Sequence, residues 1–403
     1  MPTFVIAGAS LAGAKAAETL RDEGFDGQIV LLGAEPERPY ERPPLSKGYL
    51  LGNDALDSVY VHPVEWYAEH GVDLRMGVTV TGIDRGVAAV ITSDDSTFHY
   101  DKLLLTTGAS PRRLSFPGSD RDEVLYLRTT ADSERLRAAF QAGPRVVVAG
   151  AGWIGLETTA AARSYGCPVT VLEPQPGALQ EQLGPELGAV FADLHRSHGV
   201  DFRFGERAVE FRPGMVITSA GAEVPADLFV VGIGAAPNDQ LAAAAGLEVD
   251  NGVLTDEYLR TSDENIFAAG DVANSFNPLL GRQVRVEHWA NALNGGPAAA
   301  RSMLGQPVVY DPVPYFYSDQ YDLGMECAGL PSPGRYDQVV YRGDRDSGEF
   351  IAFWLLRGTV IAGMNVNVWD VNDAIRELVR AGQPVDKDAL RDPEIPLESL
   401  TGP

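Results

Sequence analysis

The sequence predicts an α/β protein with two parallel-sheet βαβ units and a smaller α+β domain at the C-terminus. Two observations support this prediction. A short apolar strand, a glycine-containing turn, a helical stretch and a second strand follow one another within residues 4–32, and the same pattern recurs within residues 145–172. From about residue 315 a hairpin signal replaces the alternation of strands and helices.

In each βαβ unit the glycine-containing turn separates an apolar run from a helical stretch. The first unit has apolar runs at 4–7 and 28–32, with a helix that extends to about residue 21. The second has strand signals at 145–149 and 168–172, again with a helix between them. The two units are expected to form separate domains, because repeat arrays have much shorter periods.

The remaining segments are rich in strand signals. Residues 78–81 and 88–92 resemble a meander, and residues 349–356 and 359–364 flank the dipeptide Arg357-Gly358, which indicates a hairpin. Further buried strands are expected at three places that end in or near glycine, namely residues 103–108, 228–234 and 265–271.

Composition and charge exclude several classes of protein. The chain has 403 residues, 45% of them hydrophobic, and a formal net charge of −24, so it is globular and poorly suited to bind nucleic acid or an anionic membrane. Two cysteines allow no cysteine-based metal cluster and fit a reducing compartment. No run of 18 apolar residues and no signal peptide is recognised, so a cytoplasmic protein is expected.

The glycine-containing turns carry the first functional signal. A glycine-rich turn between a strand and a helix lets the backbone approach a pyrophosphate, which then lies at the helix N-terminus. The turn at 150–155 has all three glycines, whereas the turn at 8–13 has Ser10 in the middle position. The chain is therefore expected to contain two Rossmann-like dinucleotide-binding domains, whose turn residues are Gly8, Ser10, Gly13, Gly150, Gly152 and Gly155.

An acidic residue follows the second strand of each unit. Glu35 and Glu173 are suited to accept hydrogen bonds from ribose hydroxyls. A carboxylate would repel the 2′-phosphate of NADPH, and neither Arg nor Lys occurs between Glu173 and His195. The second unit is therefore expected to prefer NADH over NADPH.

Two dinucleotide sites in one chain suggest a bound flavin and an exchanging nicotinamide. At this point the sequence resembles the FAD-dependent NAD(P)H:ferredoxin reductases of the glutathione-reductase-like superfamily. The resemblance covers essentially the whole chain, and the string Arg42-Pro43-Pro44-Leu45-Ser46-Lys47 is its most specific part. Other matching strings are Thr107-Gly108-Ala109, Gly155-Leu156-Glu157, Gly270-Asp271-Val272, Glu287-His288-Trp289-Ala290 and Pro314-Tyr315-Phe316-Tyr317-Ser318-Asp319-Gln320.

The resemblance implies roles for individual residues. Lys47 and Glu157 are expected to meet near flavin N5 as the catalytic pair, because a lysine near the ring helps to hold negative charge and a buried lysine needs a partner. Asp271 is expected just before a helix, where it could cap that helix or accept a ribityl hydroxyl. The other residues implied to bind FAD are Ala12, Arg42, Val80, Thr107, Gly108, Arg128, Gly270, Glu287, His288, Trp289, Ala290 and Tyr317. Those implied to line the NADH site are Gly152, Ile154, Glu173 and Gly234, and Trp153 and Glu157 are also expected among the cofactor-binding residues.

The resemblance also implies a domain plan and a partner. The FAD domain is expected in two segments, 1–112 and 243–314, with the NAD domain at 113–242 and the α+β domain at 315–403. The expected activity is electron transfer from NADH through FAD to a [2Fe–2S] or similar ferredoxin, which feeds a cytochrome P450 or a Rieske-type oxygenase. Neither nucleic acid nor a membrane is expected as a partner.

This sequence departs from the family pattern at two further positions. Tyr317 stands where relatives commonly have a tryptophan against the flavin. Gly177 stands where relatives often have an arginine near the adenosine of the nicotinamide cofactor. Because glycine replaces that arginine here, NADPH is further disfavoured.

Several alternatives remain on the same fold. A reductase of rubredoxin, of a small molecule or of oxygen stays open, whereas a redox-sensing scaffold that binds nucleic acid is disfavoured by the acidity. Disulfide reductases need a reactive cysteine near the flavin, but the relevant string here reads Ser46-Lys47-Gly48. His195 and His198 share a helix face without an acidic or cysteine ligand at suitable spacing, so a solvated face is expected there and no metal site.

Overall fold

The computed structural model describes residues 1–306 and 308–401, which fold into two compact units, and each unit is considered by itself. Unit 1 comprises residues 1–42, 55–110 and 235–314, and unit 2 comprises residues 43–54, 111–234 and 315–403 as far as they are described. The three-domain boundaries expected from the sequence stay a prediction.

Unit 1 is built on a five-stranded sheet in the order β19-β7-β1-β2-β3, and all neighbouring strands are parallel. β1 lies at the centre because its residues are apolar and buried on both faces. The strands are β1 (Thr3–Ala7), β2 (Gln28–Gly33), β3 (Val72–Met76), β7 (Lys102–Leu105) and β19 (Ile266–Ala268).

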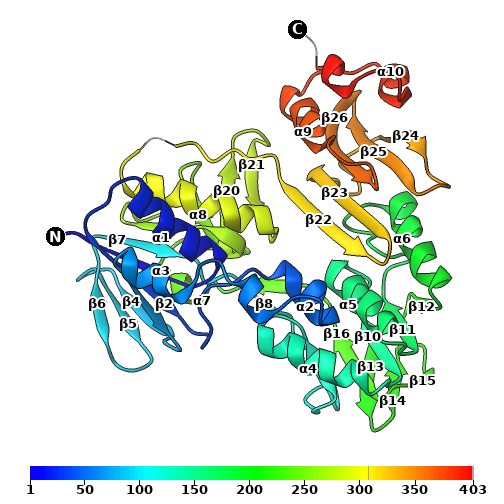
Figure 1. Ribbon diagram of the computed structural model, residues 1–403, viewed down its shortest axis with the longest axis horizontal. Coiled ribbons are helices and arrows are strands. Elements are labelled where there is room, and N and C mark those ends of the chain that lie inside the picture. Colours follow the sequence, from blue (N-terminus) through cyan, green and yellow to red (C-terminus); the bar gives the residue numbers. More distant parts are fainter. Residues whose placement is uncertain (307, 402–403) are drawn as a thin grey trace. The chain divides into compact units, whose positions relative to one another are not determined.

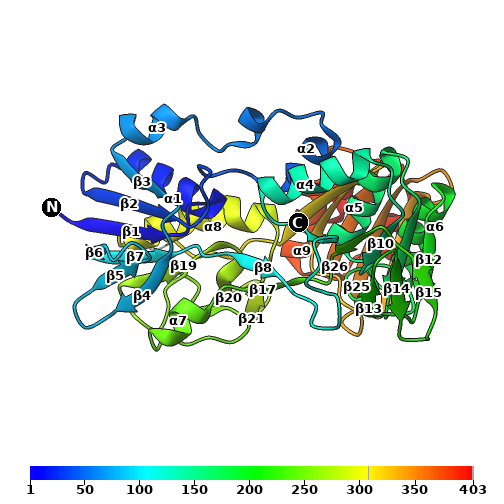
Figure 2. The ribbon, with the colours of Figure 1, turned by 90° about the horizontal axis from the view of Figure 1, so that it is seen from below.

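Two helices far apart in the sequence cover one face of this sheet. α1 (Leu11–Asp22) and α8 (Trp289–Met303) lie side by side, blue and yellow in Figures 1 and 2. They approach closely because both carry small residues, and a Cβ at Gly296 would lie 2.2 Å from the carbonyl oxygen of Ala12. The remaining elements of unit 1 are α3 (Val64–Glu69), α7 (Gln240–Ala244), β4 (Val80–Asp84), β5 (Ala89–Thr92), β6 (Thr97–His99), β17 (Ala235–Pro237), β18 (Val253–Thr255), β20 (Ala273–Asn277) and β21 (Arg282–Arg285).

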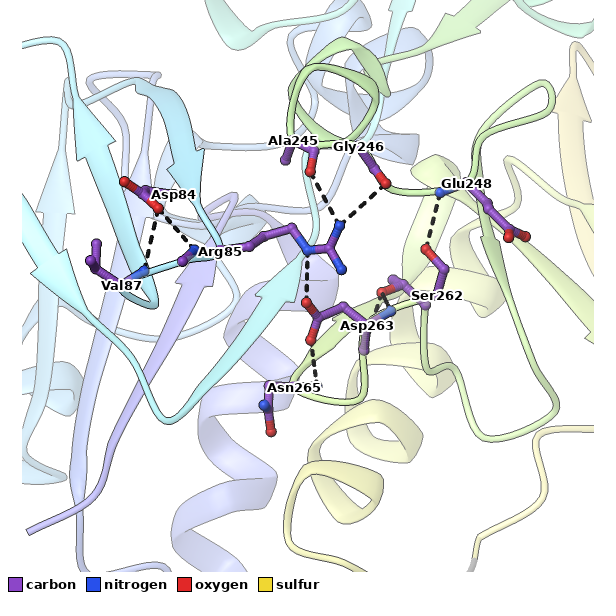
Figure 3. Close-up of polar contacts among 11 residues, drawn as sticks. Asp84, Arg85, Val87, Ala245, Gly246, Glu248, Ser262, Asp263 and Asn265 are labelled. Atoms are coloured by element: carbon purple, nitrogen blue, oxygen red, sulfur yellow. Dashed lines mark hydrogen bonds and ion pairs between the residues drawn. The ribbon is translucent and has the colours of Figure 1, made fainter.

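The meander β4-β5-β6 is joined to later parts of unit 1 by one arginine (Figure 3). The Arg85 Nε donates to Asp263 Oδ2 at 2.7 Å, and its Nη1 donates to the carbonyl oxygens of Ala245 and Gly246, which follow α7. The other carboxylate oxygen of Asp263 accepts the backbone N–H of Asn265 at 3.0 Å. The contacts therefore hold the meander against the segment that leads into β19.

Unit 2 repeats the parallel arrangement in the order β12-β11-β10-β16-β9. α5 (Trp153–Ser164) connects β10 to β11, so the βαβ pattern expected from the sequence is present in both units. The strands are β9 (Val124–Tyr126), β10 (Val146–Ala149), β11 (Val169–Glu173), β12 (Asp201–Phe204) and β16 (Leu228–Val231). Further elements are α2 (Gly48–Leu51), β8 (Ala109–Pro111, which straddles the two units), α4 (Thr130–Gln141), α6 (Pro185–Ser197), β13 (Ala208–Arg212), β14 (Met215–Thr218) and β15 (Glu223–Pro225).

The C-terminal part of unit 2 is an antiparallel sheet in the order β22-β23-β26-β25-β24 (Figure 1). Its strands are β22 (Tyr315–Gln320), β23 (Leu323–Gly329), β24 (Gln338–Asp344), β25 (Glu349–Leu356) and β26 (Thr359–Val366), with α9 (Asn372–Ala381) and α10 (Lys387–Arg391) after them. The expected hairpin joins β25 to β26, and Arg357 and Gly358 both have positive φ angles, 52° and 82°. The predicted fold class is therefore confirmed.

None of the described helices combines the length and the apolar character that crossing a membrane requires.

Candidate functional site: two glycine turns and a buried ion pair

The turn at the start of α1 is held tightly against β7. Gly8 has a φ of +126°, and a Cβ there would lie 2.1 Å from the carbonyl oxygen of Thr106, so only glycine fits. Ser10 is the N-cap residue of α1, but its φ of −126° and ψ of −167° are extended angles that any residue adopts. The serine in the middle position therefore leaves the geometry of the turn intact.

The turn at the start of α5 is built in the same way. A Cβ at Gly150 would lie 2.4 Å from the carbonyl oxygen of Gly232, and one at Gly155 would lie 2.0 Å from that of Gly150. Gly152 differs from both, because a Cβ there would meet no atom within 4 Å. The middle position of this turn therefore has room for a bound group, at the N-terminus of a twelve-residue helix.

This difference predicts opposite effects of two substitutions. Gly152→Thr is expected to leave the free energy of unfolding within about 1 kcal/mol and to raise the KM for the nicotinamide cofactor about tenfold, since the added atoms occupy the room beside the turn. Gly155→Ala is expected to destabilise the protein by about 3 kcal/mol, because its Cβ meets backbone. Denaturant unfolding and steady-state kinetics of both variants test this. Equal stability losses would contradict it.

Glu35, the acidic residue after β2, is held by an ion pair and by a tyrosine hydroxyl. Glu35 accepts hydrogen bonds from the Arg42 Nη2 at 2.6 Å and from the Tyr40 hydroxyl. Burial of the Arg42 guanidinium lowers its pKa, but Tyr40, Glu35 and Asp271 more than offset this, so the pKa of Arg42 lies above its usual value. Unit 1 therefore holds a fixed positive charge beside Glu35 and Asp271.

Asp271 lies in a three-residue 3₁₀ turn, Gly270–Val272, which leads into strand β20. The helix expected after Asp271 is therefore wrong, because the chain continues as a β-ribbon with β21. The carbonyl oxygen of Asp271 accepts from the Arg285 Nη1 at 3.2 Å, and the same nitrogen pairs with Glu287 at 2.5 Å. Arg285 thus connects the Glu287 side chain to the backbone of Asp271.

The start of α8 places two of the predicted residues at a helix N-terminus. His288 is the N-cap residue of α8, and Trp289 and Ala290 are its first two helical residues. Burial raises the pKa of Glu41, and the neighbouring side chains of Trp289 and Lys15 oppose this shift in part. No pattern in the sequence indicated that Glu41 and Trp289 are neighbours.

The other residues predicted for FAD fall in both units. In unit 1 a Cβ at Gly270 would lie 3.2 Å from that of Ala12, and a Cβ at Gly13 would lie 2.2 Å from the carbonyl oxygen of Gly8. Val80 packs against an apolar core, and Thr107 Oγ1 donates to the Asn238 carbonyl at 2.8 Å. Their roles stay predictions, as do those of the neighbouring Gly108 of unit 1 and of Arg128 and Tyr317 of unit 2.

Glu173 lies at the end of β11 and contacts the second glycine turn directly. Its Oε2 accepts the backbone N–H of Ala151 at 2.7 Å, and its Oε1 accepts that of Gln175 at 2.8 Å. The carboxylate is therefore fixed beside the turn, which is the position predicted for a ribose acceptor. Ile154 is 44% exposed on α5, and Gly234 follows β16, the strand next to β10.

Lys47 and Glu157 form the expected pair. Lys47 precedes α2 and Glu157 lies on α5, and the Lys47 Nζ is 2.8 Å from the Glu157 Oε1 with side-chain exposures of 16% and 5%. The Lys47 Nζ is also 5.4 Å from the centroid of the Tyr317 ring. A cation and an anion are thus held together in the interior of unit 2, with an aromatic ring beside them.

Two serines complete the surroundings of the Glu157 carboxylate. Ser46 donates to Oε2, and Ser318 donates to Oε1 at 2.7 Å. Both stand inside strings that carried the family resemblance, although neither was predicted as a site residue. The Glu157 carboxylate therefore accepts from three side chains, Lys47, Ser46 and Ser318.

His195 corrects one expectation about unit 2. Its side chain is completely buried and hydrogen-bonded to Gln320 and Tyr321, so the solvated face expected for it is wrong. Across residues 1–306 and 308–401, no group of three or more His, Cys, Asp or Glu side chains is placed to hold a metal ion. Both cysteines, Cys167 and Cys327, are free and buried.

Comparison with known proteins identifies the family. Residues 2–296 match the family model described as pyridine nucleotide-disulphide oxidoreductase, and residues 315–401 match the reductase C-terminal model. The chain is 42% identical over 402 residues to the anthranilate 1,2-dioxygenase system ferredoxin–NAD(+) reductase component of Burkholderia cepacia, covering 98% of each chain. It is 38% identical to rhodocoxin reductase of Rhodococcus erythropolis, covering 98% of this chain and 93% of that one.

The fold comparison agrees with the sequence comparison. The crystal structure of a covalent putidaredoxin reductase–putidaredoxin complex matches with a TM-score of 0.95 and 36% identity, covering 99% of this chain and 98% of the other. These matches confirm the resemblance found in the sequence. The chain belongs to the pyridine nucleotide-disulphide oxidoreductase family, in the group that contains putidaredoxin reductase and rhodocoxin reductase.

Proposed function

We propose that this chain is an NADH-dependent ferredoxin reductase that carries electrons from NADH through FAD to an iron–sulfur protein. The observation that carries the proposal is the pair of glycine turns, one in each unit, at the N-termini of α1 and α5. Two such turns in one chain provide for two dinucleotides, and flavin is the cofactor that can accept a hydride and release electrons one at a time.

FAD fits the residues of unit 1. The turn at Gly8 presents backbone N–H groups at the start of α1 for a pyrophosphate, and Arg42 adds a positive charge nearby. Glu35 follows β2, where a ribose acceptor belongs. When bound, FAD would supply the two-electron to one-electron conversion that the reaction needs.

NADH fits the residues of unit 2. The open Cβ direction of Gly152 leaves room for the pyrophosphate, and the fixed carboxylate of Glu173 is placed to accept from ribose hydroxyls. The same carboxylate would repel a 2′-phosphate, so NADH is the preferred donor.

Glu173→Gln is expected to reduce the preference for NADH over NADPH, measured as the ratio of kcat/KM values, about tenfold. The glutamine oxygen can still accept the Ala151 N–H, so the turn keeps its contact while the repelling charge is lost. Steady-state kinetics with both cofactors measure the ratio. An unchanged ratio, with the wild-type fold retained, would contradict the role of Glu173 in cofactor choice.

The Lys47–Glu157 pair is proposed as the catalytic pair at the flavin. A lysine ammonium held in the interior can stabilise negative charge that develops on a reduced ring, and Glu157 is the counter-ion that holds this lysine in place. Neither cysteine offers an alternative, since the pKa of the buried Cys167 thiol is raised by desolvation and so is that of Cys327.

The partner is proposed from the relatives. The Burkholderia cepacia relative is a ferredoxin–NAD(+) reductase component of a dioxygenase system, and the matching crystal structure contains putidaredoxin reductase bound to putidaredoxin. By likeness to them, a ferredoxin that serves an oxygenase is the acceptor proposed for this chain.

NADH-driven reduction of cytochrome c by the purified holoprotein, with and without an added [2Fe–2S] ferredoxin, tests the proposal. A rate that rises and saturates with ferredoxin is expected. If the rate does not depend on ferredoxin, and oxygen, rubredoxin or a quinone is reduced rapidly instead, the acceptor is not a ferredoxin.

A further inference from the structure

A continuous series of hydrogen bonds connects Glu157 to the edge of unit 2. Ser318 Oγ donates to Glu157 Oε1 at 2.7 Å, and Gln320 Nε2 donates to Ser318 Oγ at 3.1 Å. Gln320 Oε1 lies 2.8 Å from His195 Nε2, and the Tyr321 hydroxyl lies 3.1 Å from His195 Nδ1. The four links join α5, β22, α6 and the turn after β22 within one unit.

The series is buried over most of its length. Glu157, Ser318, Gln320 and His195 are at most 4% exposed, and only Tyr321 reaches partly exposed surface. Ser318 and Gln320 alternate with an exposed residue on β22, so both face inward. Buried polar groups are stable only when they are all hydrogen-bonded, so each member of the series constrains its neighbours.

The chemistry of the groups fixes the direction of every bond. Glu157, paired with Lys47, is a carboxylate and can only accept, so the single hydroxyl proton of Ser318 points to it. Ser318 must then accept from the amide nitrogen of Gln320, which turns the amide oxygen toward His195. Nε2 of His195 therefore carries the proton, and Nδ1 accepts from Tyr321.

A reversed Gln320 amide would not fit this arrangement. Its oxygen would face Ser318, whose one proton cannot serve both Glu157 and Gln320. The neutral imidazole agrees with the assignment, since burial lowers the pKa of His195 to about 4 although its hydrogen bond to Gln320 acts in the opposite direction.

We propose that His195 and Gln320 are positioning residues for the Lys47–Glu157 pair: through the amide of Gln320, His195 fixes the hydroxyl of Ser318 and thereby the Glu157 carboxylate that faces Lys47. The proposal rests on the proposed catalytic role of that pair. It goes beyond that role because it assigns a function to His195, which is connected to Lys47 only through four successive contacts and touches neither Lys47 nor Glu157 in that series.

Two substitutions of His195 separate positioning from simple core packing. His195→Gln keeps a donor where Nε2 lies, so the bond to Gln320 survives. His195→Asn is also polar but is too short to reach Gln320 and retains a group only near the position of Nδ1. His198→Gln, on the same helix, serves as the control because His198 stacks on Tyr321 without entering the series.

The kinetic test uses the holoprotein with NADH and ferredoxin. His195→Asn is expected to lower kcat about tenfold with the KM for NADH within twofold of wild type, because the pair is misplaced while the NADH turn is intact. His195→Gln is expected to restore most of the loss. Equal kcat values for the Asn and Gln variants would overturn the proposal, as would a loss in His198→Gln equal to that in His195→Asn.

A second readout needs no flavin. Long-range ¹H–¹⁵N correlation NMR of the imidazoles in wild-type protein should show His195 as the neutral tautomer protonated at Nε2 near pH 7, and Ser318→Ala should shift its ring nitrogens. A tautomer protonated at Nδ1 would overturn the proposal even if a variant fails to fold. If wild type passes no electrons to ferredoxin while the tautomer is as expected, the proposed function fails and the hydrogen-bond assignment stands.

Discussion

Lys47→Met is expected to lower ferredoxin-linked turnover at saturating NADH about 100-fold, because the positive charge that we propose to act on the flavin is lost. The same substitution is expected to lower the free energy of unfolding by about 3 kcal/mol. Stability falls because the Glu157 carboxylate, which is 5% exposed, would lose Lys47, its charged partner at 2.8 Å. Ser46 and Ser318 remain as neutral donors.

The double variant Lys47→Met/Glu157→Gln separates the two effects. Removing both charges should recover most of the stability, because no buried charge is left without a partner, while turnover stays low. Arg145→Met serves as the surface control, since the Arg145–Asp227 pair is about half exposed and its loss should cost under about 1 kcal/mol.

Two results would contradict these expectations. If the single and the double variant were equally stable, Lys47 and Glu157 would not depend on each other as their 2.8 Å contact implies. If turnover of Lys47→Met stayed within a few-fold of wild type, the lysine would have no catalytic role. Stability is measured by denaturant unfolding, and turnover in the cytochrome c assay.

Local features of the sequence predicted the parts of the fold that depend on local interactions. The apolar residues within 4–7 and 145–149 correspond to central strands. A strand that is buried on both faces of a parallel sheet does not alternate between apolar and polar residues, so it is seen in the sequence as an apolar run. The hairpin at Arg357-Gly358 was also evident, since a two-residue turn with two positive φ angles strongly selects its residues. The glycine turns were recognised for the same reason.

Features that depend on distant segments were missed. The residues after Asp271 were expected to form a helix, but their partner is β21, and a strand partner cannot be seen from one segment alone. Residues 43–54 belong to unit 2 although the chain on both sides of them belongs to unit 1. The neighbours of Glu157 likewise come from two segments far from it in the sequence, so only Lys47 could be named, through the family resemblance.

His195 shows the same limit in another way. Its spacing to His198 indicates one helix face, but the sequence does not reveal which later segment covers that face. In the structure Gln320 and Tyr321 cover His195, which lies four residues after the buried Phe191 of α6. Helical periodicity from Phe191 and Leu187 would have indicated burial more reliably than the polarity of the side chain.

The buried state of His195 predicts a loss of stability in mild acid. Burial lowers its pKa from 6.5 to about 4. Between these pH values His195 is protonated in the unfolded chain but stays neutral in the folded protein. The free energy of unfolding therefore falls as the pH falls from about 6.5 to about 4. The full difference corresponds to about 3 kcal/mol, and it is complete below about pH 4.

Comparison with a variant isolates this contribution from the many carboxylates of an acidic protein. His195→Gln keeps the bond to Gln320 but cannot take up the proton, so its stability should fall less than that of wild type between about pH 6.5 and 4. The difference between the two curves should reach about 3 kcal/mol, and His198→Gln should follow wild type. Parallel curves for wild type and His195→Gln would mean that the imidazole is solvated or protonated in the folded state. The positioning role needs an imidazole that is buried against Gln320 and accepts from Tyr321 at Nδ1, so that result would also remove the basis for assigning His195 that role.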